Sequence, residues 1–242
     1  MIREAVLNTT GKTIEESDIQ DFEARLAGYL VLPEDEDYDE ARKIWNAMID
    51  KRPAIIVKCL GMHDVIHAVE FARKQALRVS VRGGGHNIAG TSLSDDGMVI
   101  DLSLMRDIKV DLDSRTVRAQ PGCTLGDLDN ETQKYGYVVP SGIVTETGIA
   151  GLTLGGGFGW LSRKYGYTCD NLISADIVTA DGDFLRANNV ENADLFWGIR
   201  GGGGNFGIVT SFEYQMHAVG PTVLGGLVLY PMEQAKEVVQ FF

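Results

Sequence analysis

The sequence has few cysteines, a deficit of basic residues and no long apolar run. Its three cysteines, Cys59, Cys123 and Cys169, are odd in number and far apart, which argues against a disulfide framework or a zinc site. Lys and Arg number 22 against 34 Asp and Glu, a net charge of −12, so nucleic acid is not an expected partner. Residues 1–12 do not resemble a signal peptide, and no stretch of about 18 apolar residues could span a membrane. We therefore expect a soluble, cytoplasmic protein with reduced thiols and no membrane partner.

Several common catalytic motifs are also missing. Residues 11–13 (GKT) match the end of a P-loop, but Val6 stands where that motif requires glycine. Residues 202–207 fit GxGxxG, yet they follow a short predicted helix and precede a strand, whereas dinucleotide-binding proteins have strand before and helix after. No GxSxG, HExxH or EF-hand pattern occurs. Hydrolase and metalloenzyme functions therefore have no support in the sequence.

Glycine, in contrast, is abundant and concentrated in three segments. Seven glycines lie within eighteen residues of the segment Pro140–Asp170, which we expect to be neither a regular helix nor a strand. RGGGHN at 82–87 follows a predicted strand, and RGGGGNFG at 200–207 precedes another. Successive unobstructed N–H groups bind anions, so the three segments predict one extended, phosphate-bearing ligand. The alternative is a set of tight turns in a glycine-rich β-protein.

Hydrophobic periodicity predicts the remaining elements. Helices are expected at 13–26, 39–50, 64–75, 124–135, 192–199 and 233–242. Strands are expected at 54–59, 78–81, 98–102, 108–111, 116–120, 172–179, 184–187, 208–214 and 226–229. Thr13 and Glu16 are placed as a capping box, and Ile44, Trp45, Met48 and Ile49 are expected on the buried side of the second helix. Parallel strands in the first part of the chain and antiparallel strands in the rest predict the α+β class.

Three segments, taken in order, resemble a known family. They are RGGGHNIAG (82–90), SGIVTETGIAGLTLGGGFGWLSRKYG (141–166) and ADLFWGIRGGGGNFGIVT (193–210). Together they resemble the PCMH-type FAD-binding domain of the vanillyl-alcohol oxidase superfamily, and most closely its berberine bridge enzyme-like and oligosaccharide oxidase branch. The resemblance covers about 51–220 and implies two α+β subdomains with FAD between them. We accordingly expect a helical lead-in at 1–50 and, at 221–242, the start of a truncated substrate domain.

The resemblance also implies which residues bind the cofactor. The motif that begins at Arg82 would form the loop at the FAD pyrophosphate, and the central glycines would pass along the diphosphate and ribityl chain. Gly207 and Ile208 would lie near the flavin and adenine ends. The expected cofactor-binding residues are Arg82, Gly83, Gly84, Gly85, His86, Asn87, Gly90, Gly148, Gly151, Gly155, Gly156, Gly157, Gly159, Gly207 and Ile208.

His86 is the residue that the resemblance links to the flavin. A histidine of this motif is bonded in the family to the flavin 8α carbon, and such a substituent withdraws electrons and strengthens the flavin as a hydride acceptor. The alternative is a loop histidine that only hydrogen-bonds main chain. Val144 stands where bicovalent relatives carry a cysteine bonded to flavin C6, so His86 is the sole expected attachment. His63, His67 and His217 are expected on helix surfaces or in loops.

The activity implied by the resemblance is that of an FAD-dependent oxidoreductase of the oxidase type. Hydride would pass from an alcohol, sugar or similar small-molecule C–H donor to the flavin, with dioxygen as the acceptor and hydrogen peroxide as the product. The family supplies the catalytic base from its substrate domain, so no base is assigned here. Tyr165 and Tyr167 are candidate pocket residues. Two alternatives stay open: a non-catalytic FAD-binding fragment, and a dehydrogenase that uses another acceptor.

Overall fold

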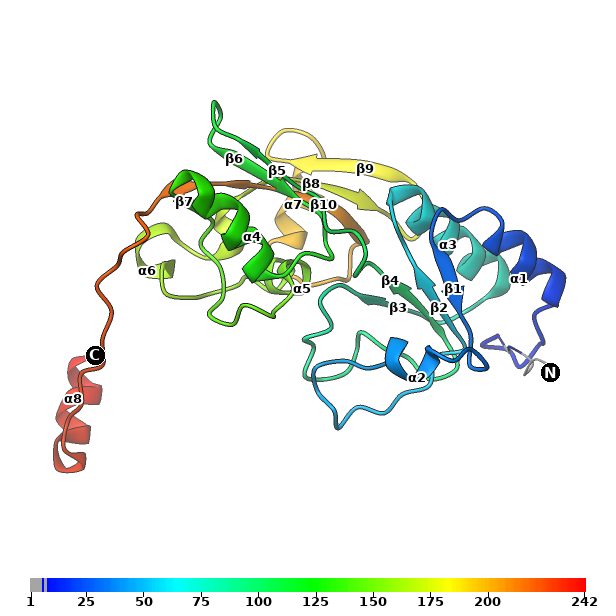
Figure 1. Ribbon diagram of the computed structural model, residues 1–242, viewed down its shortest axis with the longest axis horizontal. Coiled ribbons are helices and arrows are strands. Elements are labelled where there is room, and N and C mark those ends of the chain that lie inside the picture. Colours follow the sequence, from blue (N-terminus) through cyan, green and yellow to red (C-terminus); the bar gives the residue numbers. More distant parts are fainter. Residues whose placement is uncertain (1–5, 7) are drawn as a thin grey trace.

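The computed structural model describes residue 6 and residues 8–242, which contain two larger β-sheets lying end to end (Figure 1). The first sheet has the strand order β1-β2-β4-β3. In chain order its strands are β1 (Tyr29–Val31), β2 (Ile55–Lys58), β3 (Val79–Arg82) and β4 (Met98–Asp101). β2, β4 and β3 are parallel, and β1 is antiparallel to β2. The predicted parallel strands in the first part of the chain are therefore confirmed. β2 and β3, the two strands of the predicted strand-helix-strand unit, are not neighbours, because β4 lies between them.

Helices cover both faces of the first sheet, which explains why the first three residues of β2 and of β4 are all apolar rather than alternating with polar ones. On one face lie α3 (Met62–Gln75) and α1 (Glu16–Glu23), joined by a stack of Phe22 on Phe71 with 4.2 Å between ring centroids. On the other face lies α2 (Tyr38–Ala41), where the Tyr38 hydroxyl donates to the carbonyl of Pro53 at 2.6 Å.

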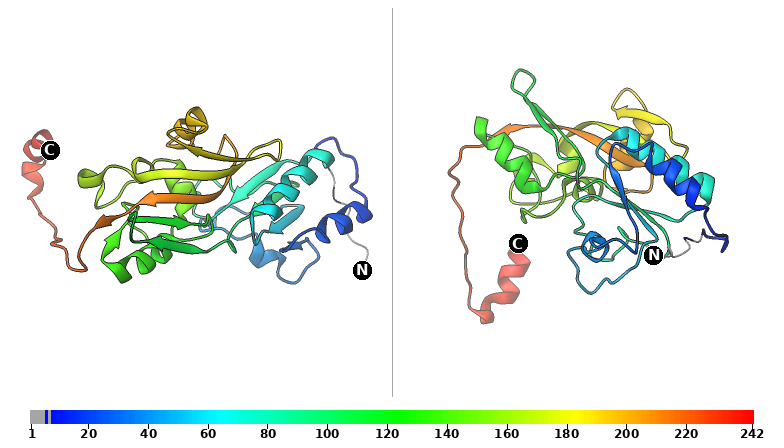
Figure 2. Two further views of the ribbon diagram at one scale, coloured as in Figure 1. Left: turned by 90° about the horizontal axis from the view of Figure 1, so that it is seen from above. Right: turned by 45° about the vertical axis from the view of Figure 1, so that its right-hand side comes forward.

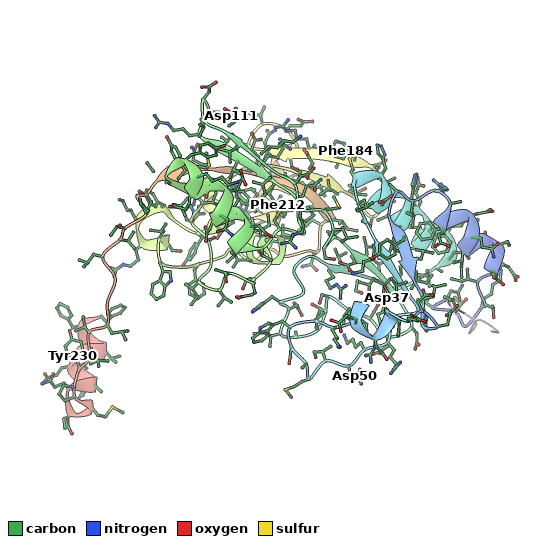
Figure 3. The ribbon with its side chains drawn as sticks, in the orientation of Figure 1. Asp37, Asp50, Asp111, Phe184, Phe212 and Tyr230 are labelled. Atoms are coloured by element: carbon green, nitrogen blue, oxygen red, sulfur yellow. The ribbon has the colours of Figure 1, made fainter. Side chains whose placement is uncertain are left out.

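The second sheet is antiparallel, with the order β5-β6-β10-β8-β9. Its strands are β5 (Ile108–Asp111), β6 (Thr116–Ala119), β8 (Leu172–Val178), β9 (Phe184–Asn188) and β10 (Ile208–Gln215). Figure 3 shows Phe212 in the interior of this sheet's layer and Asp111 at the tip of the β5–β6 hairpin. The outer face is polar: Arg118 pairs with both Asp176 (2.8 Å) and Glu213 (3.1 Å).

The inner face of the second sheet packs against short helices and forms a core of its own. These helices are α4 (Leu125–Thr132), α5 (Ile149–Leu154) and α7 (Ala193–Ile199). The remaining elements are β7 (Tyr137–Val138), β11 (His217–Ala218), α6 (Ser162–Tyr165), η1 (Gln133–Tyr135), η2 (Thr168–Asn171), η3 (Met232–Gln234) and α8 (Ala235–Phe241). The α+β class and the antiparallel remainder are confirmed. His217 lies in β11 rather than in a loop.

The predicted start of the first helix is wrong. α1 begins at Glu16 after an N-cap at Glu15, and no side chain caps it, so Thr13 and Glu16 do not form a capping box. The Gln20 side chain instead donates to Glu16 at 3.1 Å. The strands β1, β7 and β11 were not predicted, because each is only two or three residues long and forms only through its distant partner.

The predicted helix at 39–50 is largely absent. α2 ends at Ala41, and the chain then turns irregularly until Asp50; Figure 3 labels Asp37 and Asp50 near the two ends of this segment. Ile44 and Ile49 do pack on the core. Trp45 is 60% exposed and Met48 89% exposed, so their predicted burial is wrong.

Two further predictions about regular structure are wrong. The central glycine segment contains the short helices α5 and α6, so it is not free of helix. No strand forms at 226–229, and this segment has no regular structure. Beyond it α8 stands apart from both sheets (Figure 2). None of the helices in the described part of the chain is long and apolar enough to cross a membrane.

Candidate functional site

The three glycine segments meet around one cavity of about 940 Å³. The first segment enters it from the carboxyl end of the parallel strand β3, the position where α/β sheets usually bind ligands. The second contributes the turn before α5 and that helix itself, and the third contributes the loop before β10. The lining residues are Val79–Val81, Gly83–Ala89, Thr91, Ser92, Leu102, Thr147, Gly148, Ala150–Leu152, Leu154, Gly155, Gly203–Asn205 and Gly207–Val209.

Main-chain contacts bring these segments together. A Cβ placed on Gly84 would lie 2.5 Å from the Cα of Gly148, a distance that real atoms do not adopt. The N–H groups of Gly201 and Gly203 both donate to the carbonyl of Leu154, at 3.0 and 2.9 Å. The second segment therefore touches the first and is hydrogen-bonded to the third.

The structure brings ten of the predicted cofactor-binding residues to the cavity wall. They are Gly83, Gly84, Gly85, His86, Asn87, Gly148, Gly151, Gly155, Gly207 and Ile208. A Cβ on Gly151 would meet nothing within 4 Å, so no protein contact requires glycine there. Gly151 lies inside α5, where glycine costs up to about 1 kcal/mol relative to alanine. A ligand passing close to the backbone would explain why this residue is glycine.

Other predicted residues lie away from the cavity wall, and the protein itself constrains several of them. A Cβ on Gly157 would collide with the Thr168 hydroxyl, and one on Gly159 with the carbonyl of Ser141. Gly90 has φ of +70° and would meet Ile49 at 2.7 Å. Gly156 has φ of +104° and open space around it. Contact of these four glycines with a cofactor stays a prediction.

Arg82 is the fifth predicted residue outside the cavity wall. It is buried below the glycine loop, where it shares the carboxylate of Asp101 with Lys58. Burial alone would raise the pKa of Asp101, but hydrogen bonds and charge from Arg82 and Lys58 hold that pKa below its usual range. Arg82 also donates to the carbonyl of Lys43 at 3.0 Å. In this structure Arg82 anchors the loop from beneath.

Two side chains at the cavity carry buried polar atoms without a hydrogen-bond partner among the described residues. They are His86, whose Nε2 is unpartnered, and Ser92, whose hydroxyl is unpartnered. The His86 ring stacks on Trp45, with centroids 4.4 Å apart and planes at 23°. Because unpaired buried polar groups are costly, these two atoms fit a wall that a bound ligand completes.

The cavity wall is nearly free of ionisable side chains. Among the residues that the structure describes in this wall, His86 alone has an ionisable side chain. The other polar groups of the wall are Ser, Thr and Asn side chains and backbone amides, a suitable set for a pyrophosphate next to an extended aromatic ring. Cys59, Cys123 and Cys169 are free and buried elsewhere, and burial raises the pKa of Cys123 to about 12.

Sequence reasoning missed several residues of this site and proposed two that lie outside it. Ser92 lines the cavity, but an isolated serine carries no motif, and Leu152 lines it within the second motif, of which only glycines were predicted to bind the cofactor. Trp45 was predicted to be a buried helix residue. Tyr165 and Tyr167 do not line the cavity: Tyr165 stacks on His217 at 4.1 Å, and Tyr167 is 56% exposed. Their role as pocket residues stays a prediction.

Comparison with known proteins agrees with this geometry. Residues 53–188 match the family model of an FAD binding domain. An FAD-linked oxidoreductase of Dictyostelium discoideum is 40% identical over 220 residues, which cover 90% of this chain and 48% of that protein. The crystal structure of 6-hydroxy-D-nicotine oxidase from Arthrobacter nicotinovorans has a TM-score of 0.78 and 39% identity, covering 80% of this chain and 43% of that one.

A glucooligosaccharide oxidase from Acremonium strictum is also similar, with a TM-score of 0.77 and 30% identity over 82% of this chain and 42% of its own. Its structure is described as containing a 6-S-cysteinyl, 8α-N1-histidyl FAD. The present chain spans less than half the length of each of these three relatives.

The family match extends over more than half of the chain, so this protein belongs to the FAD-binding domain family. Within that family it has the PCMH-type fold of the vanillyl-alcohol oxidase superfamily, as the glycine motifs predicted. FAD is the cofactor of this family, and the cavity residues fit it.

Proposed function

We propose that this chain is the cofactor-binding part of an FAD-linked oxidase with a single covalent bond between His86 and the flavin. The observation that carries this proposal is the cavity in which His86 and the three glycine segments meet. Bound there, FAD would supply hydride acceptance. The glycine loops would hold its pyrophosphate through main-chain N–H groups.

The substrate in this proposal is a small alcohol, sugar or similar C–H donor, and the electron acceptor is dioxygen. The similar proteins are named as oxidases of 6-hydroxynicotine and of oligosaccharides, which supports this substrate class. No carboxylate lines the part of the cavity that the structure describes, so we assign the proton acceptor for the substrate to none of these residues. The domain boundaries expected from the sequence, 51–220 for the FAD-binding domain, remain part of this proposal.

The test is the fate of the flavin after acid precipitation. We expect purified protein to be yellow and to retain its flavin in the precipitate, with the flavin on the peptide that contains His86. His86→Ala should bind FAD but release it in acid, because the glycine loops do not depend on the imidazole. His63→Ala is the control, since His63 is exposed on α3. Colourless protein that cannot be reconstituted with FAD would refute the proposal.

Oxygen consumption separates the proposed oxidase from its two alternatives. Donor-dependent oxygen uptake with peroxide release supports the oxidase. Reduction of a dye without oxygen uptake would indicate a dehydrogenase, and FAD that no donor reduces would indicate a non-catalytic flavin-binding module.

A further inference from the structure

The segment 43–51 runs beside residues 82–93, which contain the first glycine segment. Its irregular path, which replaces the predicted helix, allows both main-chain and side-chain groups to reach that loop. The contacts are Arg82 to the Lys43 carbonyl (3.0 Å), the Trp45 N–H to the Gly85 carbonyl (3.0 Å), the Asn46 side chain to the Ile88 carbonyl (2.8 Å), and the Lys51 ammonium to the carbonyls of Gly90 (2.8 Å) and Leu93 (3.0 Å). These bonds fix Trp45 beside His86.

Trp45 contacts His86 face to face, not at its edge. The ring centroids are 4.4 Å apart and the planes differ by 23°. No described residue is hydrogen-bonded to Nε2 of His86, so no hydrogen bond at that nitrogen restrains the imidazole, whereas the stack on Trp45 contacts its face. Trp45 leaves 60% of its surface exposed, although burying an indole is strongly favourable. Contact with His86 therefore explains the position of Trp45 better than packing into the hydrophobic core does.

We propose that Trp45 is a positioning residue for the attachment of flavin to His86. The inference rests on the proposed function, because it requires the His86 bond. Attachment replaces one imidazole N–H bond and one C–H bond at the flavin 8α carbon with an N–C bond, and it releases two protons and two electrons. Dioxygen takes up the two protons and the two electrons and becomes hydrogen peroxide.

The stack matters because the imidazole lone pair lies in the plane of the ring. A ring that rotates freely about its side-chain bonds presents that lone pair to the cofactor only part of the time. Contact with Trp45 on one face restricts the plane of the ring, and at the ring edge Nε2 has no hydrogen-bond partner among the described residues. Restricting a reacting group to its productive orientation raises the rate of bond formation without changing the strength of cofactor binding.

The experiment measures two quantities in purified protein: total FAD per chain, and the fraction that stays with the protein after acid precipitation. We expect Trp45→Leu, which keeps apolar bulk but no ring, to lower the acid-stable fraction at least fivefold while total FAD changes less than twofold. Trp45→Phe, which can still stack, should restore most of the acid-stable fraction. Trp197→Ala is the matched control, because Trp197 is 75% exposed on α7 and does not line the cavity.

The outcomes separate this inference from the proposed function. Equal acid-stable fractions in Trp45→Leu and wild type overturn the inference and leave the proposed function standing. Equal loss in Trp45→Leu and Trp45→Phe also overturns it, since stacking would then not be the cause. Flavin that is acid-labile in the wild type, or attached at a residue other than His86, overturns the proposed function and the inference with it.

Discussion

The backbones of Gly84 and Gly148 touch in the wall of the cavity. A Cβ on Gly148 would lie 2.6 Å from the amide nitrogen of Gly84, and a Cβ on Gly84 would be equally close to Gly148. Gly84 follows a strand of the first sheet, and Gly148 precedes α5 under the second. Glycine at both positions therefore lets the two halves of the molecule close around the cofactor site.

Gly148→Ala should destabilise the protein even without FAD. The new methyl group must push the two segments apart, and overpacking of this kind costs about 1–3 kcal/mol. Denaturant unfolding of flavin-free protein measures this loss. Gly204→Ala is the control: a Cβ there meets nothing within 4 Å, so its effect on stability should stay within about 0.5 kcal/mol. Equal stability of both variants would contradict the contact.

Gly151→Ala should have the opposite effect on stability. Gly151 lies within α5 and nothing surrounds its Cβ position, so alanine should stabilise the flavin-free protein by about 0.5–1 kcal/mol. The same methyl group enters space beside the cavity, and we expect FAD to bind at least tenfold more weakly, a difference of about 1.4 kcal/mol. Unfolding and FAD titration measure the two effects. A variant that is more stable and binds FAD unchanged would show that the cofactor does not pass Gly151.

The central strands could be predicted because their signals are local. Residues 55–57 and 98–100 are consecutive apolar positions, which indicates strands buried on both faces. The segment 39–50 was mispredicted because its apolar residues recur at helical spacing for a different reason. Ile44 and Ile49 meet the core, whereas Trp45 meets His86, some forty residues away in sequence. No local pattern contains that contact.

The glycines identified the site without showing what each one does. Gly151 and Gly159 look alike in the sequence. A side chain at residue 151 would enter open space, whereas the carbonyl of Ser141 leaves no room for a side chain at residue 159. Ligand contact and tight internal packing both select glycine, and only coordinates distinguish them. Ser92 could not be predicted, because its unpartnered hydroxyl becomes informative only when its burial is known.

Asp101→Asn should be strongly destabilising. Asp101 is fully buried and pairs with both Lys58 (2.5 Å) and Arg82, whose charges would remain buried without compensation. Breaking a buried ion pair in this way costs about 3–5 kcal/mol. Glu131→Gln removes the exposed pair with Lys134 and should cost no more than about 1 kcal/mol. Denaturant unfolding of the two variants compares these values, and similar small losses would contradict the buried cluster.

Asp101 should also make stability depend on pH in the acid range. Its folded-state pKa is held below the unfolded value of about 3.9. Such a carboxylate stabilises the fold fully above that unfolded value, and the stabilisation is lost as pH falls through the lower folded pKa. Unfolding measured from pH 6 to pH 2 should therefore show a loss that begins near pH 4. Asp101→Asn should lack this part of the pH dependence, and an unchanged profile in the variant would contradict the assignment.

Val144→Cys should create a second bond to the flavin, in which an S–C bond replaces the thiol S–H and the flavin C6–H bonds and dioxygen takes up the two electrons and two protons. Val144 is 42% exposed at the start of a turn in which the Thr147 N–H donates to its carbonyl at 3.1 Å, immediately before α5 and the cavity. The resemblance places the flavin C6 cysteine of bicovalent relatives at this position, and the similar glucooligosaccharide oxidase is described with such a cysteinyl bond.

In the double variant His86→Ala, Val144→Cys, the flavin should survive acid precipitation through the new thiol alone. Mass spectrometry of the flavin-bearing peptide tests this. Ile143→Cys, next in the chain and 58% exposed, is the control and should form no bond. Attachment at residue 143 but not at 144 would show that the register of the flavin against this turn is wrong.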